Sequence, residues 1–301
     1  QVVSGQEFAA KFYPDSTFDN RHRLEKEAKA CRFMYSNGIN SVPKHFWSDL
    51  NLNFSLFEWI DGKEIVNVND TNIRRAAEFV ESLFEISKYT DNKDFPLATA
   101  ACLNGEMIEK QIIRRYSKII EIKDLASEVM DFLKDDFSIT FEKVLSKSKK
   151  TWPGNFCKEL HYKYQILSPS DFGFHNTFLT KDGLKFFDFE YFGWDDPVKL
   201  TCDFLLHPGM HLSKKQKNLW LQSMQKIFSN DKIFFPRLIS SYGLYGLCWC
   251  LIMLNIFTDS YDNENYKVLG ESFKIERKKK SQLEKAMDML MHVNETYEKG
   301  L

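Results

Sequence analysis

Several features that mark specialised protein classes are missing from this sequence. Its six cysteines are scattered, and no two stand in the Cys-x-x-Cys spacing of zinc or redox sites. Reduced, mostly buried thiols fit this distribution best, and they predict a cytoplasmic protein. The longest apolar run, residues 242–257, contains two glycines and an asparagine and is shorter than the roughly 20 residues that span a membrane. We therefore expect a buried helix there and no membrane span.

An excess of one charge is also absent. Lys and Arg total 41 against 42 for Asp and Glu, which leaves a net charge of -1. Because no global positive field draws the chain to polyanions, we expect no nucleic-acid partner. The 301 residues, 43% hydrophobic and 28% charged, are typical of a folded protein with one large enzyme fold or two lobes.

The N-terminal part of the chain predicts strands and one helix. Residues 6–13 and 52–60 have strand patterns that end in turn-forming residues. Between them a helix is predicted from about Phe18, with a single apolar face made of Leu24, Ala28, Cys31 and Met34. We expect a small, sheet-rich N-terminal lobe over residues 1–61.

The rest of the chain, residues 62–301, is predicted to form a larger helical lobe. Helical patterns cover residues 71–89, 107–136, 141–148 and most of 214–301. The lysine-rich residues 146–150 predict a solvated loop without a function. One hairpin interrupts the helices, because Asp182-Gly183 lies between two runs of alternating apolar residues. The expected fold class is therefore α+β.

The segment from Ser168 to Trp194 carries the most informative chemistry. Asp171 and Asn176 stand in a D-x-x-x-x-N spacing before the hairpin, and Asp188 ends it. Phosphoryl transfer needs a carboxylate beside the attacking hydroxyl and oxygen ligands that hold Mg²⁺ against the phosphates. The hairpin would return Asp188 to the edge that carries Asp171 and Asn176. Since Mg²⁺ prefers hard oxygen ligands and keeps several waters, these residues form a sufficient set.

These motifs resemble those of the aminoglycoside phosphotransferase and choline kinase family, distant relatives of the protein kinases. The family's catalytic loop, H-G-D-x-x-x-x-N, is matched at Asp171 and Asn176, and its metal strand, I-D-W-E, is matched by residues 187–190. A G-W-x-D-P motif follows at residues 193–197. The resemblance implies a two-lobed kinase-like fold, with Asp171 as the catalytic base and Asn176 and Asp188 as ligands of Mg²⁺. It also implies ATP or GTP as the co-substrate.

The resemblance extends to a lysine and glutamate near the N-terminus. In the family a strand lysine contacts the nucleotide phosphates and pairs with a glutamate on the next helix. Lys11 takes the lysine's position. Glu27 is the better partner than Glu25, because it lies three residues beyond Leu24 and four before Cys31 on the apolar face.

The hinge of the family is matched by residues 56–62. Its backbone groups would hold the adenine, which assigns nucleotide binding to Glu58, Trp59 and Ile60. The resemblance covers residues 6–205, with two departures. Pro169 replaces the histidine of the catalytic loop, and no glycine-rich phosphate loop precedes Lys11. We expect that loop upstream of Gln1.

Other interpretations of single residues are less favoured. His175 is assigned to loop packing, because its position is not catalytic in the family. His207 and His211 stand four apart, but Pro208-Gly209 between them disrupts a helical zinc site. An ordinary carboxylate at Asp188 is disfavoured, since a charge inside so aromatic a strand costs several kcal/mol unless it is paired or bound to metal.

The implied function is transfer of a phosphoryl group to a hydroxyl of a small molecule, such as a sugar, an amino alcohol or an aminoglycoside. The alternative is a catalytically inactive, nucleotide-binding domain with a regulatory role, favoured by Pro169 and the missing phosphate loop. A protein kinase is disfavoured, because no A-P-E motif follows Asp188. The unweighted candidates for the acceptor pocket are Trp194, Asp203, Trp220 and Trp249.

Overall fold

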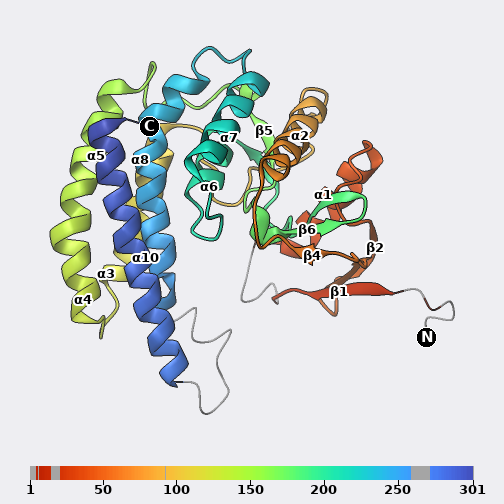
Figure 1. The fold of residues 1–301 in the computed structure, drawn as a ribbon, viewed down its shortest axis with the longest axis horizontal. Coiled ribbons are helices and arrows are strands. Elements are labelled where there is room, and N and C mark those ends of the chain that lie inside the picture. Colours follow the sequence, from red (N-terminus) through yellow and green to blue (C-terminus); the bar gives the residue numbers. More distant parts are fainter. Residues whose placement is uncertain (1–4, 6, 15–20, 92, 259–271, 301) are drawn as a thin grey trace. The chain divides into compact units, whose positions relative to one another are not determined.

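The computed structural model describes residues 5, 7–14, 21–91, 93–258 and 272–300 (Figure 1). The chain packs into two compact units, and each of them is discontinuous in sequence. The first comprises Gln1–Ala101 and Leu160–Asp231, and the second comprises Cys102–Glu159 and Lys232–Leu301. The lobe boundary predicted at residues 61–62 falls inside the first unit, so the predicted division into two lobes stays a prediction.

The N-terminal part of the first unit is a three-stranded antiparallel sheet of β1 (Phe8–Phe12), β2 (His45–Asp49) and β3 (Phe54–Glu58). The strand order is β1-β3-β2, and Lys11 lies opposite Ser55. β1 and β3 were predicted, whereas β2 was not. The register of β2 shifts between His45 and Trp47, and this irregularity removes the alternation that marks a strand in sequence.

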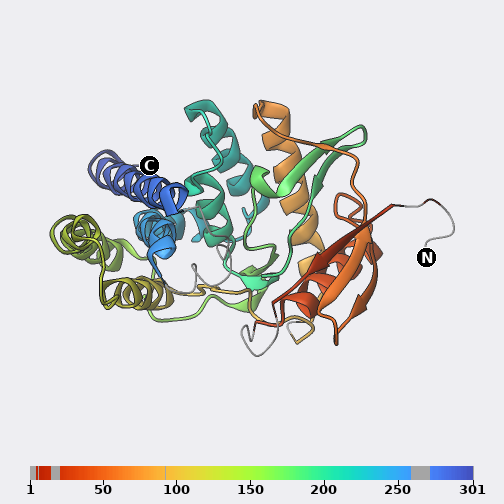
Figure 2. The ribbon, with the colours of Figure 1, turned by 90° about the horizontal axis from the view of Figure 1, so that it is seen from below.

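Helix α1 (Arg23–Ser36) lies against this sheet (Figure 2). It buries the predicted apolar face, and Glu27 is buried on the same side. The helix begins at Arg23, later than predicted, while Phe18 lies outside the described residues. A helix in this position carries its buried glutamate toward the strand that holds Lys11.

Two further small sheets complete the strands of the first unit. One has the order β4 (Lys63–Glu64), β6 (Thr177–Thr180) and β7 (Gly183–Phe186), and the other pairs β5 (Ile166–Ser168) with β8 (Gly193–Asp195). The β6-β7 hairpin was predicted, and Gly183 takes the positive φ of 127° that favours glycine in a turn. Its second strand ends at Phe186, so the expectation that Asp188 lies inside a strand is wrong.

An aromatic core lies beneath the loop of residues 169–176, between α2 (Asp70–Ser87), α6 (Pro197–Leu206) and α7 (Lys214–Ile227). Phe79 of α2 stacks on Phe172 with ring centroids 5.4 Å apart. Phe204 of α6 stacks on Trp220 of α7 with ring centroids 3.8 Å apart. Burial of each large ring contributes about 1.5–3 kcal/mol. Because Phe172 follows Asp171 directly, this packing fixes the backbone that carries the predicted catalytic base.

The second unit is helical. Its helices are α3 (Gly105–Ile120), α4 (Ser127–Asp131), α5 (Ser138–Thr151), α8 (Phe234–Met253) and α10 (Ser272–Lys299), with a π-helical turn at Phe132–Phe137 and a 3-10 turn at Leu254–Phe257. Figures 1 and 2 show α5, α8 and α10 packed side by side. The helical pattern predicted over residues 107–136 is interrupted at residues 121–126, so a single helix there is wrong. The π-helical turn joins α4 to α5 without a break.

The segment Phe234–Phe257, which is α8 with the 3-10 turn after it, is long and apolar enough to cross a membrane by length and composition. In the most apolar 18-residue window of this segment, 72% of the residues are buried inside the structure. Within the second unit Gly246 gives α10 room, since a Cβ there would lie only 2.4 Å from Val293. Close packing of this kind is typical of a core helix, as the sequence predicted.

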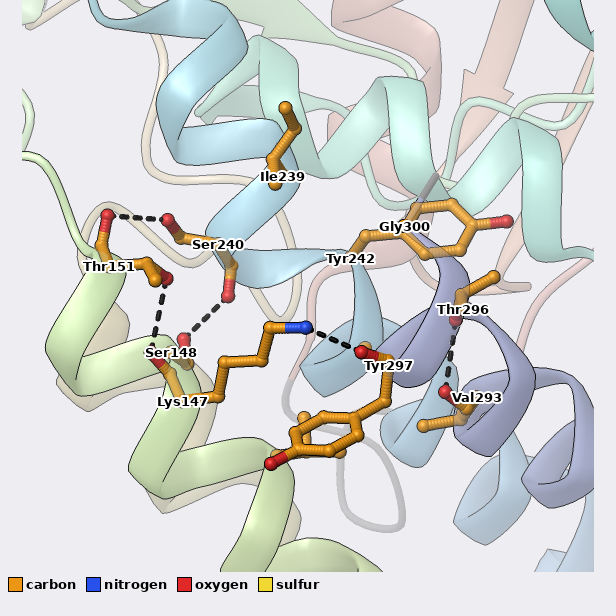
Figure 3. A pocket seen from close by; sticks show the side chains of 12 residues that line it. Lys147, Ser148, Thr151, Ile239, Ser240, Tyr242, Val293, Thr296, Tyr297 and Gly300 are labelled. Carbon is orange, nitrogen blue, oxygen red and sulfur yellow. Dashed lines mark hydrogen bonds between the residues drawn. The ribbon is translucent and has the colours of Figure 1, made fainter.

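Residues 146–150 form the last turns of α5, so the loop predicted there is wrong. Figure 3 shows the reason at a cavity of about 90 Å³ between α5, α8 and α10. The Lys147 Nζ donates to the carbonyl of Tyr297 at 2.5 Å and lies 4.4 Å from its ring. Ser148 donates to the carbonyl of Ser240 at 2.6 Å. These tertiary contacts stabilise a helical end that its lysine-rich sequence does not indicate.

Candidate active site

The Lys11 ammonium lies at the centre of a cluster of carboxylates in the first unit. Its Nζ is 2.6 Å from Glu27 Oε2 and 2.6 Å from Asp188 Oδ1. Glu190 Oε2 lies at 3.5 Å. Burial by itself would lower the pKa of Lys11, but Glu27 and Asp188 raise it above its ordinary value, so the side chain stays an ammonium. The predicted pair of Lys11 with Glu27 forms, while its role in phosphate binding stays a prediction.

Glu27 is held by more than its lysine. The Tyr13 hydroxyl donates to Oε2 at 2.7 Å, and the backbone N–H of Phe189 donates to Oε1 at 3.2 Å. Burial raises the pKa of this carboxyl, although Lys11 opposes the effect. Since only 3% of the residue is exposed, these donors are what make its burial tolerable. Glu27 therefore joins β1, α1 and the segment around Asp188.

Asp188 stands just after β7 with a positive φ of 68°. Aspartate is one of the few residue types that tolerate this left-handed conformation. The next carboxylate along, Glu190, accepts from Arg23 at 3.0 Å. Asp188 is 35% exposed at its side chain, against 11% for Glu190 and 3% for Glu27. Of the three, Asp188 is the carboxylate that a ligand can reach.

These three carboxylates lie close enough to hold a metal ion, with ligand atoms within 4.8 Å of one another. The Lys11 ammonium already supplies the positive charge among them, so the three carboxylates together bind the lysine and not a metal ion. Asp188 Oδ1 faces Lys11, which leaves Oδ2 for a cation. Oxygen donors of this kind fit Mg²⁺.

The loop of residues 169–176, predicted to be catalytic, brings Asn176 close to the backbone that precedes Asp188. The Asn176 side-chain Nδ2 donates to the backbone carbonyl of Asp171 at 3.0 Å. The backbone carbonyl of Asn176 accepts from the N–H of Phe187 at 3.1 Å. The predicted return of the hairpin toward the D-x-x-x-x-N loop is therefore observed. With its amide nitrogen bound to Asp171, Asn176 has its side-chain oxygen to offer a cation.

The Asp171 carboxylate has a partner that sequence reasoning missed. His175 Nε2 lies 3.1 Å from Oδ1, within the same loop. Burial alone would raise the pKa of Asp171, but the hydrogen bond from His175 and the nearby imidazoles of His175 and His207 outweigh it and lower the pKa. Asp171 is therefore a carboxylate at neutral pH. His175 packs within the loop as predicted, and its contact with the Asp171 carboxylate is an addition to that prediction.

Asp171, His175 and His207 also carry ligand atoms within 4.8 Å of one another. The two imidazole rings stack with centroids 3.9 Å apart and planes 8° apart. Because the lone pair of each ring nitrogen lies in its own ring plane, two nearly parallel stacked rings do not converge on one ion. This geometry favours a stacked pair over a zinc site, and His211 is not part of the cluster.

The predicted hinge residues lie at and just beyond the end of β3. The N–H of Glu58 donates to the carbonyl of Lys44 at 2.8 Å, and its carboxylate accepts from Lys185 at 3.1 Å. Trp59 is 55% exposed. The N–H and the carboxylate of Glu58 therefore have partners within the protein. The assignment of Glu58, Trp59 and Ile60 to the nucleotide stays a prediction.

Two of the acceptor candidates are structural residues of the first unit. Trp220 is fully buried on Phe204, and its indole N–H donates to the carbonyl of Thr201 at 3.2 Å. Trp194 is 2% exposed in β8. Asp203 pairs with Lys199 at 2.7 Å, and Trp249 lies on α8 in the second unit. The burial of Trp194 and Trp220 leaves Asp203 and Trp249 as the remaining predicted candidates for the acceptor pocket.

No protein-family model and no curated protein matches this chain. Solved structures do match it. An ethanolamine kinase of Plasmodium vivax has a TM-score of 0.58 at 15% identity, covering 96% of this chain and 76% of its own. A choline kinase of Streptococcus pneumoniae has a TM-score of 0.57 at 13% identity, covering 96% and 87%.

A spectinomycin phosphotransferase, solved with ADP and spectinomycin, gives a TM-score of 0.58 at 10% identity and covers 95% of this chain and 87% of its own. At identities this low, the structural matches establish the fold, and the activity has to be argued from the site. The chain has the α+β, kinase-like fold that the sequence motifs predicted.

Proposed function

We propose that this chain is a magnesium-dependent phosphotransferase that moves the γ-phosphoryl group of ATP or GTP to a hydroxyl of a small molecule. The position of the Lys11 ammonium carries the proposal. Its Nζ lies 2.6 Å from Glu27, 16 residues away, and 2.6 Å from Asp188, 177 residues away. Phosphoryl transfer requires this combination of a cation for the phosphates beside a carboxylate for the metal.

Each residue has a distinct role in the proposed reaction. Lys11, oriented by Glu27, contacts the nucleotide phosphates, and the backbone of residues 58–60 holds the base. Asp188 and Asn176 would hold Mg²⁺, which when bound neutralises charge on the phosphates. Asp171 accepts the proton of the acceptor hydroxyl. The hydroxyl oxygen bonds to the γ-phosphorus as the bond to the nucleoside diphosphate breaks.

The acceptor class is supported by the names of the structural neighbours. They are described as an ethanolamine kinase, a choline kinase and a spectinomycin phosphotransferase. These acceptors are alcohols that also carry an amino or ammonium group, so we place amino alcohols and aminoglycosides ahead of plain sugars. The cytoplasmic location and the lack of a nucleic-acid partner stay predictions from cysteine usage and charge.

The test is a transfer assay with ATP and with GTP, with and without Mg²⁺, against a panel of amino alcohols, aminoglycosides and sugars. We expect release of the nucleoside diphosphate that depends on one acceptor class and on the metal. The Asp171→Asn variant serves as the control for contaminating kinases. Tight binding of the magnesium nucleotide without acceptor-dependent turnover would instead support the inactive, regulatory domain.

A further inference from the structure

We infer that His175 is a positioning residue that holds the Asp171 carboxylate in its reactive orientation. The inference rests on the proposed role of Asp171 as the base. His175 Nε2 lies 3.1 Å from Oδ1, whereas Asn176 Nδ2 lies 3.5 Å from Oδ2. The imidazole therefore makes the closer contact with the carboxylate, and it leaves Oδ2 as the oxygen for the acceptor proton.

The His175 ring is itself held by a segment that is distant in the sequence, the loop after α6. It stacks on His207 with centroids 3.9 Å apart, and His207 Nδ1 accepts from the N–H of Gly209 at 3.1 Å. The neighbouring Met210 Sδ accepts from the N–H of Phe174 at 3.2 Å. The loop after α6 thus supports the catalytic loop at two successive residues.

Gly173 provides the space that this arrangement needs. A Cβ at this position would lie 2.8 Å from two atoms of the His175 ring and 2.8 Å from Met210 Sδ. Real Cβ atoms do not approach other atoms so closely, so any larger residue would displace the imidazole. The backbone of the loop is therefore built to admit this ring beside Asp171.

His175 also borders a cavity of about 460 Å³ in the first unit. The cavity is lined by residues 64–68, by Phe174 and His175, and by residues 209–211. The imidazole therefore has Asp171 as one neighbour and an open cavity as another. Removal of the ring would leave a space that a small molecule such as imidazole can enter from the cavity.

A matched pair of variants separates the hydrogen bond from packing. His175→Gln keeps an N–H donor of similar reach, whereas His175→Met has similar bulk and no donor. We expect kcat to fall about 100-fold in His175→Met and in His175→Ala, as for a misplaced catalytic group, and to stay within about threefold in His175→Gln. The KM for the magnesium nucleotide should not change, and added imidazole should restore part of the activity of His175→Ala.

His211→Asn is the control. His211 is exposed on the loop after α6 that also carries His207, and asparagine tolerates its φ of 47°. It should retain the parent kcat. Equal activity in His175→Gln and His175→Met, or no loss in His175→Ala, would overturn the inference while leaving the proposed function intact. If the parent protein transfers phosphate to no acceptor, the proposed function fails. In that case the crystal structure of His175→Met tests the inference. The Asp171 side chain should have a different orientation in this variant, and an unchanged orientation would overturn the inference.

Discussion

At the scale of single residues, the two aspartates of the site have separable roles. Asp188 has a left-handed φ of 68°, which asparagine also tolerates, so Asp188→Asn changes charge with little backbone strain. We expect this variant to lose magnesium-dependent nucleotide affinity, because a neutral amide is a poorer ligand for a hard cation. Asp171→Asn should keep nucleotide binding while transfer falls by about 10²- to 10⁴-fold. Calorimetry and a transfer assay measure the two effects, and near-parent transfer by Asp171→Asn would refute its catalytic role.

Ser170 is a second residue with an unusual backbone conformation. Its φ is 69°, where the family motif that the loop resembles has glycine. A left-handed serine costs about 1–2 kcal/mol, and glycine loses about 0.5–1 kcal/mol in chain entropy. The substitution also removes the long hydrogen bond from the Ser170 hydroxyl to the carbonyl of Thr99, at 3.4 Å, so Ser170→Gly should raise the free energy of unfolding by only about 0.5 kcal/mol. Urea denaturation measures the change. Ser82→Gly, in the exposed interior of α2, should lower stability by about 0.5 kcal/mol. Destabilisation by both variants would contradict the strain at Ser170.

The sequence predicted site residues where a local pattern orients a side chain. Glu27 was preferred to Glu25 because helical spacing alone places it on the apolar face of α1, and it pairs with Lys11 at 2.6 Å. His175 was not recognised, because its contact with Asp171 depends on how the loop folds back on itself. Its stacking partner His207 is brought in by a different element, and sequence spacing carries no information on such a meeting.

At the scale of elements, strands and helices were predicted well where periodicity and turn residues agree. The β6-β7 hairpin has both alternation and Asp-Gly, whereas β2 carries an irregularity that removes its alternation. The end of α5 reads as a charged loop but is held by the bond from Lys147 to Tyr297. Stabilisation of that kind comes from residues 150 positions apart and cannot be read from local composition.

The short strand β8 makes a prediction of its own. It lies between β5 and residues 96–98, where Trp194 exchanges backbone hydrogen bonds with Pro96 and Ala98 at 3.0 Å. A Cβ on Gly193 would lie 2.4 Å from the carbonyl oxygen of Pro96. Because a backbone atom cannot rotate away, Gly193→Ala should lower the free energy of unfolding by about 3 kcal/mol.

Gly154→Ala is the control for this substitution. Gly154 has a φ of 93° and no atom within 4 Å of a Cβ, so alanine meets strain there and no clash. We expect a loss of about 1–2 kcal/mol at this position. Denaturant titration of both variants measures the difference. Equal losses would show that the segment at residues 96–98 moves away from β8 at little cost.

At the scale of the whole molecule, every residue assigned to the nucleotide, the metal and the base lies in the first unit. A ligand stabilises the regions whose opening would destroy its site, by RT ln(1 + [L]/Kd), or about 2.7 kcal/mol at 100 times Kd. We therefore expect the magnesium nucleotide to slow amide hydrogen exchange around β1, α1, the catalytic loop and the segment after β7. Helices α5, α8 and α10 should show a smaller change. Hydrogen exchange with mass detection measures this distribution, and chelation of the metal with EDTA should abolish most of the protection. Protection confined to the second unit, or unchanged by EDTA, would remove Asp188 and Asn176 from the binding site.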